Sequence, residues 1–344
     1  MVFFARAMHN LSSLVKKLPV PSGIFLSLVV LLCLGAPLRA QFESHRDSRQ
    51  ALDYPHGSRV EFSSMKSEAI RGEENFSVFL PPSYGKGSRK YPVVYFLHGL
   101  FNDDTSWTVD SHGDIPTEVD DLMSRGVLPE MILVHPDGGR SFYTDYRDGS
   151  LLYEKLVVDE IPRYVEAKYR VEPGPQNRAI AGTSMGGYGA LKIAMKHPGQ
   201  FAAVAAHSPI VFPAKNPMDV PENARSTRQY QYLSGVFASI FGDPIDQAYF
   251  DANNPLVLAA KADITKLPIY FDYGTADRYD RLIGLGLGLQ KLDQTLTERG
   301  IAHEFHSYEG EPHGWALVYS HIGQSLRFLA DHMGGHTKDS SRGS

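Results

Sequence analysis

Cysteine is almost absent from this chain of 344 residues, whose one cysteine is Cys33. One thiol cannot form an internal disulfide framework, and it cannot supply the several ligands of a cysteine-bound zinc site. Cys33 also lies within an N-terminal segment that we expect to be removed, so the mature chain should contain no cysteine nucleophile. If the protein uses a side-chain nucleophile, it should therefore be of another residue type.

The chain also lacks an excess of positive charge. Its 34 Lys and Arg residues against 39 Asp and Glu residues give a formal net charge of −5. Nucleic-acid-binding domains concentrate basic residues on one face, so we expect no nucleic-acid partner. Hydrophobic residues make up 42% of the chain and charged residues 21%. This composition excludes a disordered or collagen-like protein and predicts a globular fold with a large core.

The apolar run near the N-terminus, residues 24–34, is too short to span a bilayer, which takes about 20 residues. It follows two lysines and precedes small and polar residues that end at Ala40. This order is typical of an export signal. We therefore predict a signal peptide at 1–40, a secreted or periplasmic protein, and no stable membrane insertion after cleavage. An uncleaved anchor or a buried helix stays open, because Leu38 is larger than the residue usual at its position.

Strand and helix patterns alternate from residue 58 to residue 333. Such alternation predicts one α/β domain with a mostly parallel sheet flanked by helices. The polar residues 41–57 are expected to form a linker, and 334–344 a flexible tail. Residues 211–266 interrupt the alternation and are rich in proline, asparagine and aromatic residues. We interpret them as an inserted, cap-like segment at one end of the sheet.

The hydrophobic period of each segment indicates its secondary structure. A continuous apolar run, as at 91–97, is typical of a strand buried on both faces. The expected strands are 75–80, 91–97, 131–134, 178–181, 202–206, 269–273 and 304–308, and the expected helices are 151–169, 185–197, 282–299 and 315–332.

The most informative motif is Gly-Thr-Ser-Met-Gly-Gly at 182–187, which fits the pattern G-x-S-x-G. A predicted strand precedes it and a predicted helix follows it, which is the setting of a nucleophile elbow. Such a turn strains the serine, needs small residues on both sides, and places the serine at the N-terminus of a helix, whose N–H groups suit an oxyanion. We interpret Ser184 as a nucleophile; a glycine-rich turn without chemistry is the alternative.

A serine hydroxyl is a weak nucleophile and needs a base that a third group orients. In this strand–turn–helix setting, the acid and then the histidine follow the serine along the chain. The predicted strand 269–273 is followed closely by Asp277, which is the expected acid. Asp280 is the fallback, and Asp272, inside the strand, is expected to be structural.

His313 is the expected base, because it lies in a loop rich in glycine and proline just before the last predicted helix. His303 and His306 are rivals, but they lie on or beside a strand. Together with Glu309 and His313 they could form a metal cluster. Their spacing matches no zinc pattern, so we expect no metal ligands.

An oxyanion hole needs two backbone N–H donors. The amide of Met185, next to the serine, is one candidate. The other is the amide of Leu100, in the loop directly after the predicted strand 91–97. His98, in the same loop, is expected to serve packing and hydrogen bonding rather than catalysis.

With these motifs in this order, the chain resembles the Putative esterase family of α/β-hydrolases. That family includes S-formylglutathione hydrolases, feruloyl and acetyl-xylan esterases, and mycolyltransferases of the antigen 85 type. The resemblance spans roughly 58–333. The matching pieces are 80–84, 91–99, 182–191, 274–277 and 312–315.

The resemblance implies an α/β-hydrolase fold and the same assignments: Ser184 as nucleophile, Asp277 as acid, His313 as base, and the amides of Leu100 and Met185 as the oxyanion hole. It also implies no metal or organic cofactor. Two features depart from the family: an export signal disfavours the cytosolic formylglutathione role, and three glycines at 284, 286 and 288 are costly inside a helix.

Aromatic residues near the motifs are candidates for substrate binding. Phe101, Trp107 and Trp315 are expected to line the pocket, whereas Tyr188, on a predicted helix, is expected in the core. The hypothesis is an exported serine carboxylic-ester hydrolase that acts on short-acyl or carbohydrate or phenolic esters. The alternatives are an acyltransferase of the mycolyltransferase type and a non-catalytic binding module on the same fold.

Overall fold

The computed structural model describes residues 49–108, 113–213, 217–218 and 222–334. The predicted signal peptide lies outside the described residues, as does most of the predicted tail. The compact unit begins at Gln50, and Tyr54 is buried. The second half of the predicted linker 41–57 is therefore part of the folded domain, because its residues pair with the sheet and pack against it.

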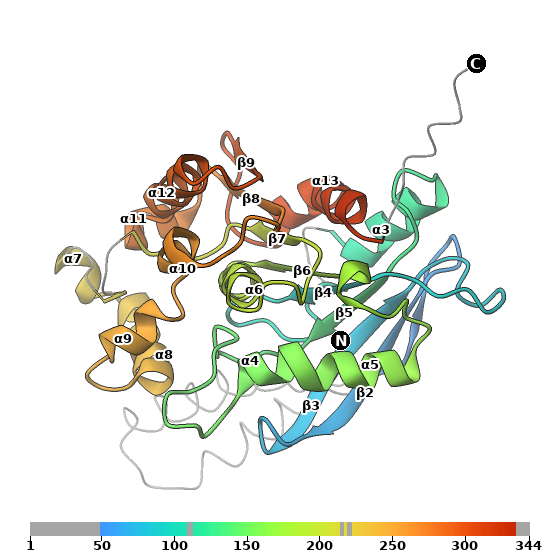
Figure 1. The fold of residues 1–344 in the computed structure, drawn as a ribbon, viewed down its shortest axis with the longest axis horizontal. Helices are drawn as coiled ribbons and strands as arrows, with labels where there is room; N and C mark the ends of the chain where they lie inside the picture. Colours follow the sequence, from blue (N-terminus) through green and yellow to red (C-terminus); the bar gives the residue numbers. More distant parts are fainter. Residues whose placement is uncertain (1–48, 109–112, 214–216, 219–221, 335–344) are drawn as a thin grey trace, which may run out of the picture. The chain divides into compact units, whose positions relative to one another are not determined.

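A nine-stranded sheet forms the centre of this unit, in the order β1-β2-β3-β5-β4-β6-β7-β8-β9 (Figure 1). The pairs β1–β2, β2–β3 and β3–β5 are antiparallel, and all the others are parallel. This confirms a mostly parallel sheet. The strands are β1 Leu52–Asp53, β2 Arg59–Ser67, β3 Gly72–Leu80, β4 Val93–Leu97, β5 Ile132–Pro136, β6 Arg178–Thr183, β7 Val204–His207, β8 Ile269–Gly274 and β9 His303–Tyr308. The first two strands were not predicted from the sequence.

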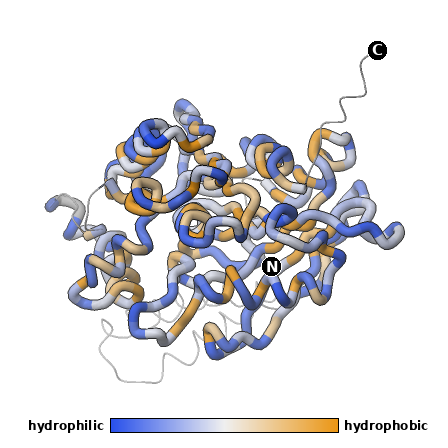
Figure 2. Tube along the Cα trace, viewed as in Figure 1, coloured by the Kyte–Doolittle hydropathy of each residue, from blue (hydrophilic) through white to orange (hydrophobic). Residues whose placement is uncertain are grey.

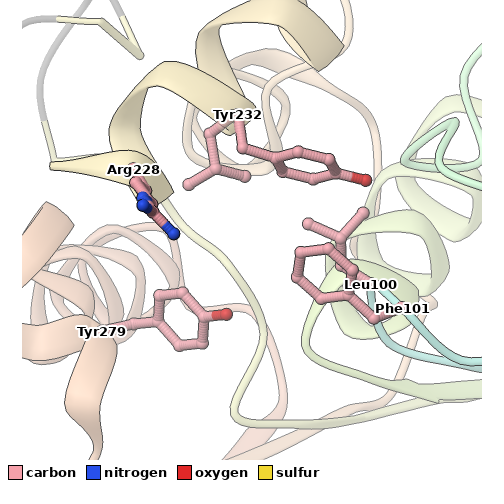
Figure 3. Close-up of a pocket in the computed structure, with 6 residues that line it drawn as sticks. Leu100, Phe101, Arg228, Tyr232 and Tyr279 are labelled. Atoms are coloured by element: carbon pink, nitrogen blue, oxygen red, sulfur yellow. The ribbon is translucent and has the colours of Figure 1, made fainter. Parts of the chain in front are cut away.

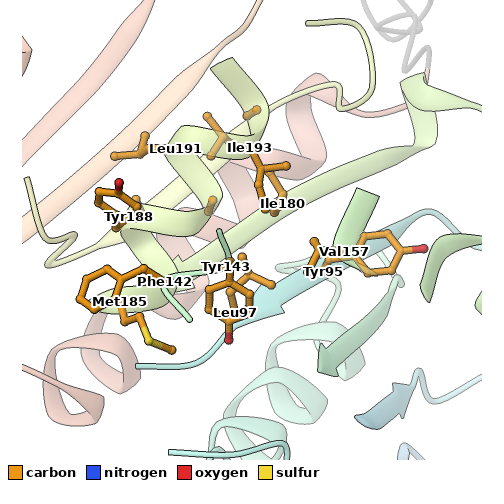
Figure 4. Packing of buried hydrophobic residues seen from close by; sticks show 14 of the residues in the cluster. Tyr95, Leu97, Phe142, Tyr143, Val157, Ile180, Met185, Tyr188, Leu191 and Ile193 are labelled. Atoms are coloured by element: carbon orange, nitrogen blue, oxygen red, sulfur yellow. The ribbon is translucent and has the colours of Figure 1, made fainter. Parts of the chain in front are cut away.

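Helices cover both faces of the sheet. Along β4, Val93, Tyr95 and Leu97 belong to one buried cluster, and Val94 and Phe96 belong to the other. Successive side chains of a strand point to opposite faces, so the continuous apolar run reflects a strand buried on both sides. Figure 4 shows part of the first cluster, packed against α6, and Figure 2 shows hydrophilic and hydrophobic residues alternating along the helices.

The first cluster includes side chains of α5, α6 and α12, and the second those of α3 and α13. The helices are α3 Ile115–Ser124, α4 Tyr153–Lys155, a π-helical turn Leu156–Glu160, α5 Ile161–Lys168, α6 Met185–Lys196, α7 Glu222–Arg225, α8 Arg228–Phe241, α9 Gln247–Asp251, α10 Pro255–Lys261, α11 Arg278–Ile283, α12 Leu285–Glu298 and α13 Trp315–His332, with a short 3-10 turn at Pro175–Asn177. Most of the predicted elements are present, whereas α3 was not predicted.

The described parts of the segment 211–266 are largely helical and contain α7 to α10. The phenylalanines of this segment, Phe212, Phe237, Phe241 and Phe250, are buried. The hydroxyl of Tyr188 on α6 donates a hydrogen bond to the carbonyl oxygen of Asn253 at 2.5 Å. Aromatic packing therefore joins the insertion to the helix that follows Ser184, and Tyr188 is the core residue that was expected.

The single helix predicted at 282–299 is wrong at its start. Helix α11 ends at Ile283, Gly284 adopts a left-handed conformation with φ 66°, and α12 begins at the next residue. A Cβ atom at Gly288 would lie 2.0 Å from the carbonyl oxygen of Val211. These glycines therefore allow a turn between two helices and a close approach to the chain that enters the insertion.

Candidate active site

Ser184 lies between the end of β6 and the first residue of α6, with φ 57° and ψ −116°. This conformation is strained for a residue with a side chain, at a cost on the order of 1–3 kcal/mol. Its amide donates a hydrogen bond to the carbonyl oxygen of His207 at 2.9 Å. A Cβ atom at Gly186 would lie 2.0 Å from the carbonyl oxygen of Leu97, and one at Gly182 2.4 Å from that of Gly186. The G-x-S-x-G glycines are thus required by steric contact with the neighbouring backbone.

The structure brings Ser184, His313 and Asp277 into one hydrogen-bonded line. The imidazole Nε2 of His313 lies 2.8 Å from the Ser184 hydroxyl oxygen. The Nδ1 atom of the same ring lies 2.5 Å from Oδ2 of Asp277. The side chains of the histidine and the aspartate are almost completely buried, with 4% exposure for His313 and 0% for Asp277. The arrangement can move a proton from the hydroxyl to a ring whose tautomer a carboxylate determines.

Two elements position these partners. Asp277 is the N-cap of α11 and accepts a hydrogen bond from the amide of Tyr279 at 2.8 Å through its other oxygen, Oδ1. His313 is held in the loop between β9 and α13, and its ring packs edge-on against the ring of Tyr279, with centroids 4.6 Å apart. Tyr279, which was not predicted as a site residue, therefore contacts both the acid and the imidazole.

The alternative candidates for the acid and the base have other hydrogen-bond partners. Asp280 accepts a hydrogen bond from the amide of Gly286 at 2.9 Å. His303 pairs with Asp293 on α12, and His306 lies 3.3 Å from Glu304. Neither histidine contacts the serine. The line through the serine is therefore formed by the first choices for acid and base.

The two expected oxyanion donors border the serine. Met185 is the first residue of α6, so its amide has no carbonyl partner within the helix. Leu100 lines the same cavities as Ser184, and within the described residues its amide donates no hydrogen bond. A Cβ atom at Gly99 would lie 3.3 Å from that of Ser184, so this loop passes close to the nucleophile.

His98 is fully buried, as expected for a packing residue. Its Nδ1 atom lies 2.8 Å from the carbonyl oxygen of Gly99, and its Nε2 atom accepts a hydrogen bond from the amide of Gly138 at 2.9 Å. The ring therefore ties the loop that carries Leu100 to the loop after β5.

The prediction that Trp107 lines the pocket is wrong. Its side chain is fully buried, its indole Nε1 donates a hydrogen bond to the Ser77 hydroxyl at 2.9 Å, and its ring stacks on His135 at 4.9 Å. The loop after β4 folds inward at this residue, and burial of the large indole decides its place. Phe101, with 63% exposure, and Trp315 both line cavities at the serine.

Two cavities meet at Ser184. The first, which we call the apolar arm, is narrow, with a volume of about 20 Å³. It is lined by Leu100, Phe142, Ser184, Met185, Ile210, Phe212, Leu233, Phe237, Tyr279 and Ile283. Three of these residues, Phe212, Leu233 and Phe237, come from the segment 211–266, whose aromatic content was noted but not assigned to the site. The insertion therefore forms one wall of the cleft.

The second cavity, which we call the polar arm, is lined by His313 as well as the serine and has a volume of about 250 Å³. It is lined by Gly99, Leu100, Phe101, Asn102, Thr183, Ser184, Arg278, Tyr279, His313, Gly314 and Trp315. An outer cavity adjoins both arms. Figure 3 shows it between Arg228 and Tyr232 of α8 on one side and Tyr279 and the Leu100–Phe101 loop on the other.

A second Ser–His–Asp arrangement lies inside the domain. The ring of His207 on β7 lies 2.8 Å from Oδ2 of Asp272 on β8 and 2.9 Å from the hydroxyl of Ser325 on α13. The hydroxyl of Tyr270 donates to the same carboxylate oxygen at 3.0 Å. The histidine, the aspartate and the serine are each 0% exposed, so no substrate can reach them. Asp272 is structural, as expected.

Comparison with known proteins identifies relatives over most of the chain. The sequence model of the Putative esterase family matches residues 67–326. Esterase Rv1288 of Mycobacterium tuberculosis is 29% identical over 268 residues, which are 73% of this chain and 55% of that protein. The chain thus spans about half the length of this curated relative.

Within the part of the chain that the structure describes, the helices are too short or too polar to span a bilayer.

Solved structures share the fold. A ferulic acid esterase is 27% identical, with a TM-score of 0.64 over 80% of this chain and 99% of that chain. An S-formylglutathione hydrolase from Agrobacterium tumefaciens is 21% identical, also with a TM-score of 0.64, over 81% of this chain and 97% of that chain. The sheet and its covering helices are therefore an α/β-hydrolase fold. The chain belongs to the Putative esterase family.

Proposed function

We propose that this protein hydrolyses carboxylic esters through Ser184, His313 and Asp277. The observation that carries the proposal is the line of hydrogen bonds from the serine hydroxyl to the imidazole at 2.8 Å and from the imidazole to the carboxylate at 2.5 Å. The strained elbow at the serine and the two cavities that meet there support it.

In the first half-reaction, the Ser184 oxygen attacks the ester carbonyl carbon while its proton moves to Nε2 of His313. Asp277 accepts the hydrogen bond of the Nδ1–H group and stabilises the charged ring. The amides of Leu100 and Met185 donate to the oxyanion. The tetrahedral intermediate then breaks its bond to the alcohol oxygen, which takes the proton from Nε2, and an acyl-enzyme remains.

In the second half-reaction, a water molecule gives a proton to His313 and attacks the acyl carbon. Collapse of this intermediate breaks the bond to Ser184, whose oxygen recovers the proton. The apolar arm holds the acyl group in this scheme. Its narrow shape and its lining by Phe142, Phe212 and Phe237 suit a short apolar acyl group.

The experiment is turnover of a panel of esters with acetyl, butyryl, feruloyl and acetyl-sugar groups by the wild type and by Ser184→Ala. We expect the variant to lose turnover by at least about 10⁴-fold and to lose labelling by a fluorophosphonate, with its melting temperature retained. Activity that survives in Ser184→Ala would remove the serine from the mechanism. A wild type that neither turns over any ester nor accepts the fluorophosphonate would indicate a binding module.

We also propose that residues 1–40 direct export. The apolar run of 11 residues behind two lysines supports this. Expression in a bacterial host with periplasmic fractionation tests it: the mature protein should begin at Gln41. Intact Met1 on protein confined to the cytoplasmic fraction would contradict it.

A further inference from the structure

The alcohol part of the substrate must lie beside His313, because that ring returns a proton to the departing oxygen. His313 lines the polar arm and does not line the apolar arm. Under the proposed function, on which this inference rests, the polar arm is therefore the alcohol site. Its side chains should match the chemistry of the alcohol.

We propose that the polar arm selects alcohols that carry an anionic oxygen group, a carboxylate or a phosphate, and that Arg278 binds this group. Arg278 is exposed, and its guanidinium forms no ion pair with any carboxylate that the structure describes. Seven of the other described arginines do pair with an acidic residue: Arg59, Arg89, Arg125, Arg147, Arg163, Arg178 and Arg327. Arg278 instead lies near the ring of Tyr279, with its guanidinium carbon 5.2 Å from the ring centroid.

The rest of the lining leaves the positive charge of Arg278 unopposed, because no Asp or Glu is among the residues that line the polar arm. A guanidinium group donates hydrogen bonds and accepts none, and it can bind a carboxylate or a phosphate through two parallel N–H groups. Arg278 can therefore bind an anionic oxygen group in this cavity without competition from an acidic side chain of the lining.

Three butyrate esters test the inference: those of 4-hydroxybenzoate, 4-hydroxyphenylphosphonate and the neutral 4-hydroxybenzamide. The wild type should favour one or both anionic esters by kcat/KM. Arg278→Gln should lower kcat/KM for the favoured anionic ester by about fivefold, and change the value for the amide by less than about twofold. Because the same esters are compared in both proteins, their intrinsic reactivities cancel.

Arg281→Gln is the matched control. Arg281 is exposed on the same helix and lines none of the cavities at the serine, and its substitution removes the same charge. It should leave the anionic-to-neutral ratio unchanged. The inference is overturned if all three esters are hydrolysed and Arg278→Gln leaves their ratio as in the wild type. Absence of turnover and of fluorophosphonate labelling in the wild type would instead overturn the proposed function itself.

Discussion

The carbonyl oxygen of His207 accepts a hydrogen bond from the amide of Ser184, and the ring of the same histidine is bonded to Asp272 and Ser325. One residue of β7 thus joins the nucleophile elbow to the strand that leads to Asp277 and to the helix that follows His313. The buried His207–Asp272–Ser325 group therefore supports each of the three elements on which the proposed catalytic residues lie.

Removal of the buried Asp272 carboxylate should destabilise the fold. Asp272→Ala removes the carboxylate that bonds Nδ1 of His207 and the hydroxyl of Tyr270, leaves that buried ring nitrogen without its partner, and should lower the free energy of unfolding by about 3–5 kcal/mol. Asp293→Ala breaks an Asp–His pair at the surface, where Asp293 is 40% exposed, and should cost less than about 1 kcal/mol. Urea denaturation measures both, and equal losses would contradict the role given to the buried group.

The two candidate acids can be separated by activity. Asp277→Asn should lower kcat by about 10³–10⁴-fold, because the amide favours the wrong tautomer of His313. Asp280→Asn retains an oxygen that can accept the hydrogen bond of the Gly286 amide and should change kcat by less than about twofold. Steady-state kinetics on a butyrate ester checks both variants. A larger loss in the Asp280 variant would reverse the assignment.

Substitutions of the two aromatic residues in the loop after β4 should have opposite effects on stability and on KM. Trp107→Phe removes the hydrogen bond to Ser77 in the core and should cost about 1–3 kcal/mol of stability, with little effect on KM. Phe101→Ala removes an exposed ring from the cleft, and should raise KM while it leaves the melting temperature within about 2 °C. Calorimetry and kinetics on the same preparations compare them. A kinetic effect confined to the Trp107 variant would restore it as a binding residue.

Protonation of Glu154 should make the free energy of unfolding depend on pH in the acid range. Burial alone would raise the pKa of its carboxyl, but Lys192, His197 and Lys196 hold that pKa well below its ordinary value. Its stabilising contribution is therefore complete above the unfolded pKa of about 4.3 and is lost as the pH falls toward the lower folded pKa. Burial in turn lowers the pKa of Lys192 to about 8, against the opposing effect of the carboxylate.

Between pH 6 and pH 2, protonation of Glu154 should lower the free energy of unfolding by about 2–3 kcal/mol. Glu154→Gln should lose stability at pH 7, because it leaves Lys192 buried without its ion pair, at a cost of about 3–5 kcal/mol. The difference in unfolding free energy between wild type and variant should then shrink as the pH falls. Parallel pH curves for the two proteins, measured by urea denaturation, would show that Glu154 contributes nothing to the acid dependence.

Residues whose environment is local were predictable. The strand, turn and helix around Ser184 are contiguous in the sequence, so the pattern of the elbow could be recognised there, although the close contact that requires Gly186 is with Leu97 on β4. Asp277 and His313 could be proposed because each follows a strand of the same parallel sheet, and the carboxyl ends of such strands share one edge. The two antiparallel strands β1 and β2 escaped prediction because their outward-facing residues break the apolar runs.

The order of chemical groups along the chain determined the family, the elbow and the candidates for acid and base. Only the tertiary structure decided that Trp107 is buried, that three glycines separate and pack two helices, and that the insertion lines one arm of the cleft. The physical reason is that burial and cavity shape depend on contacts between segments far apart in sequence, whereas a turn that strains one serine is dictated by its immediate neighbours.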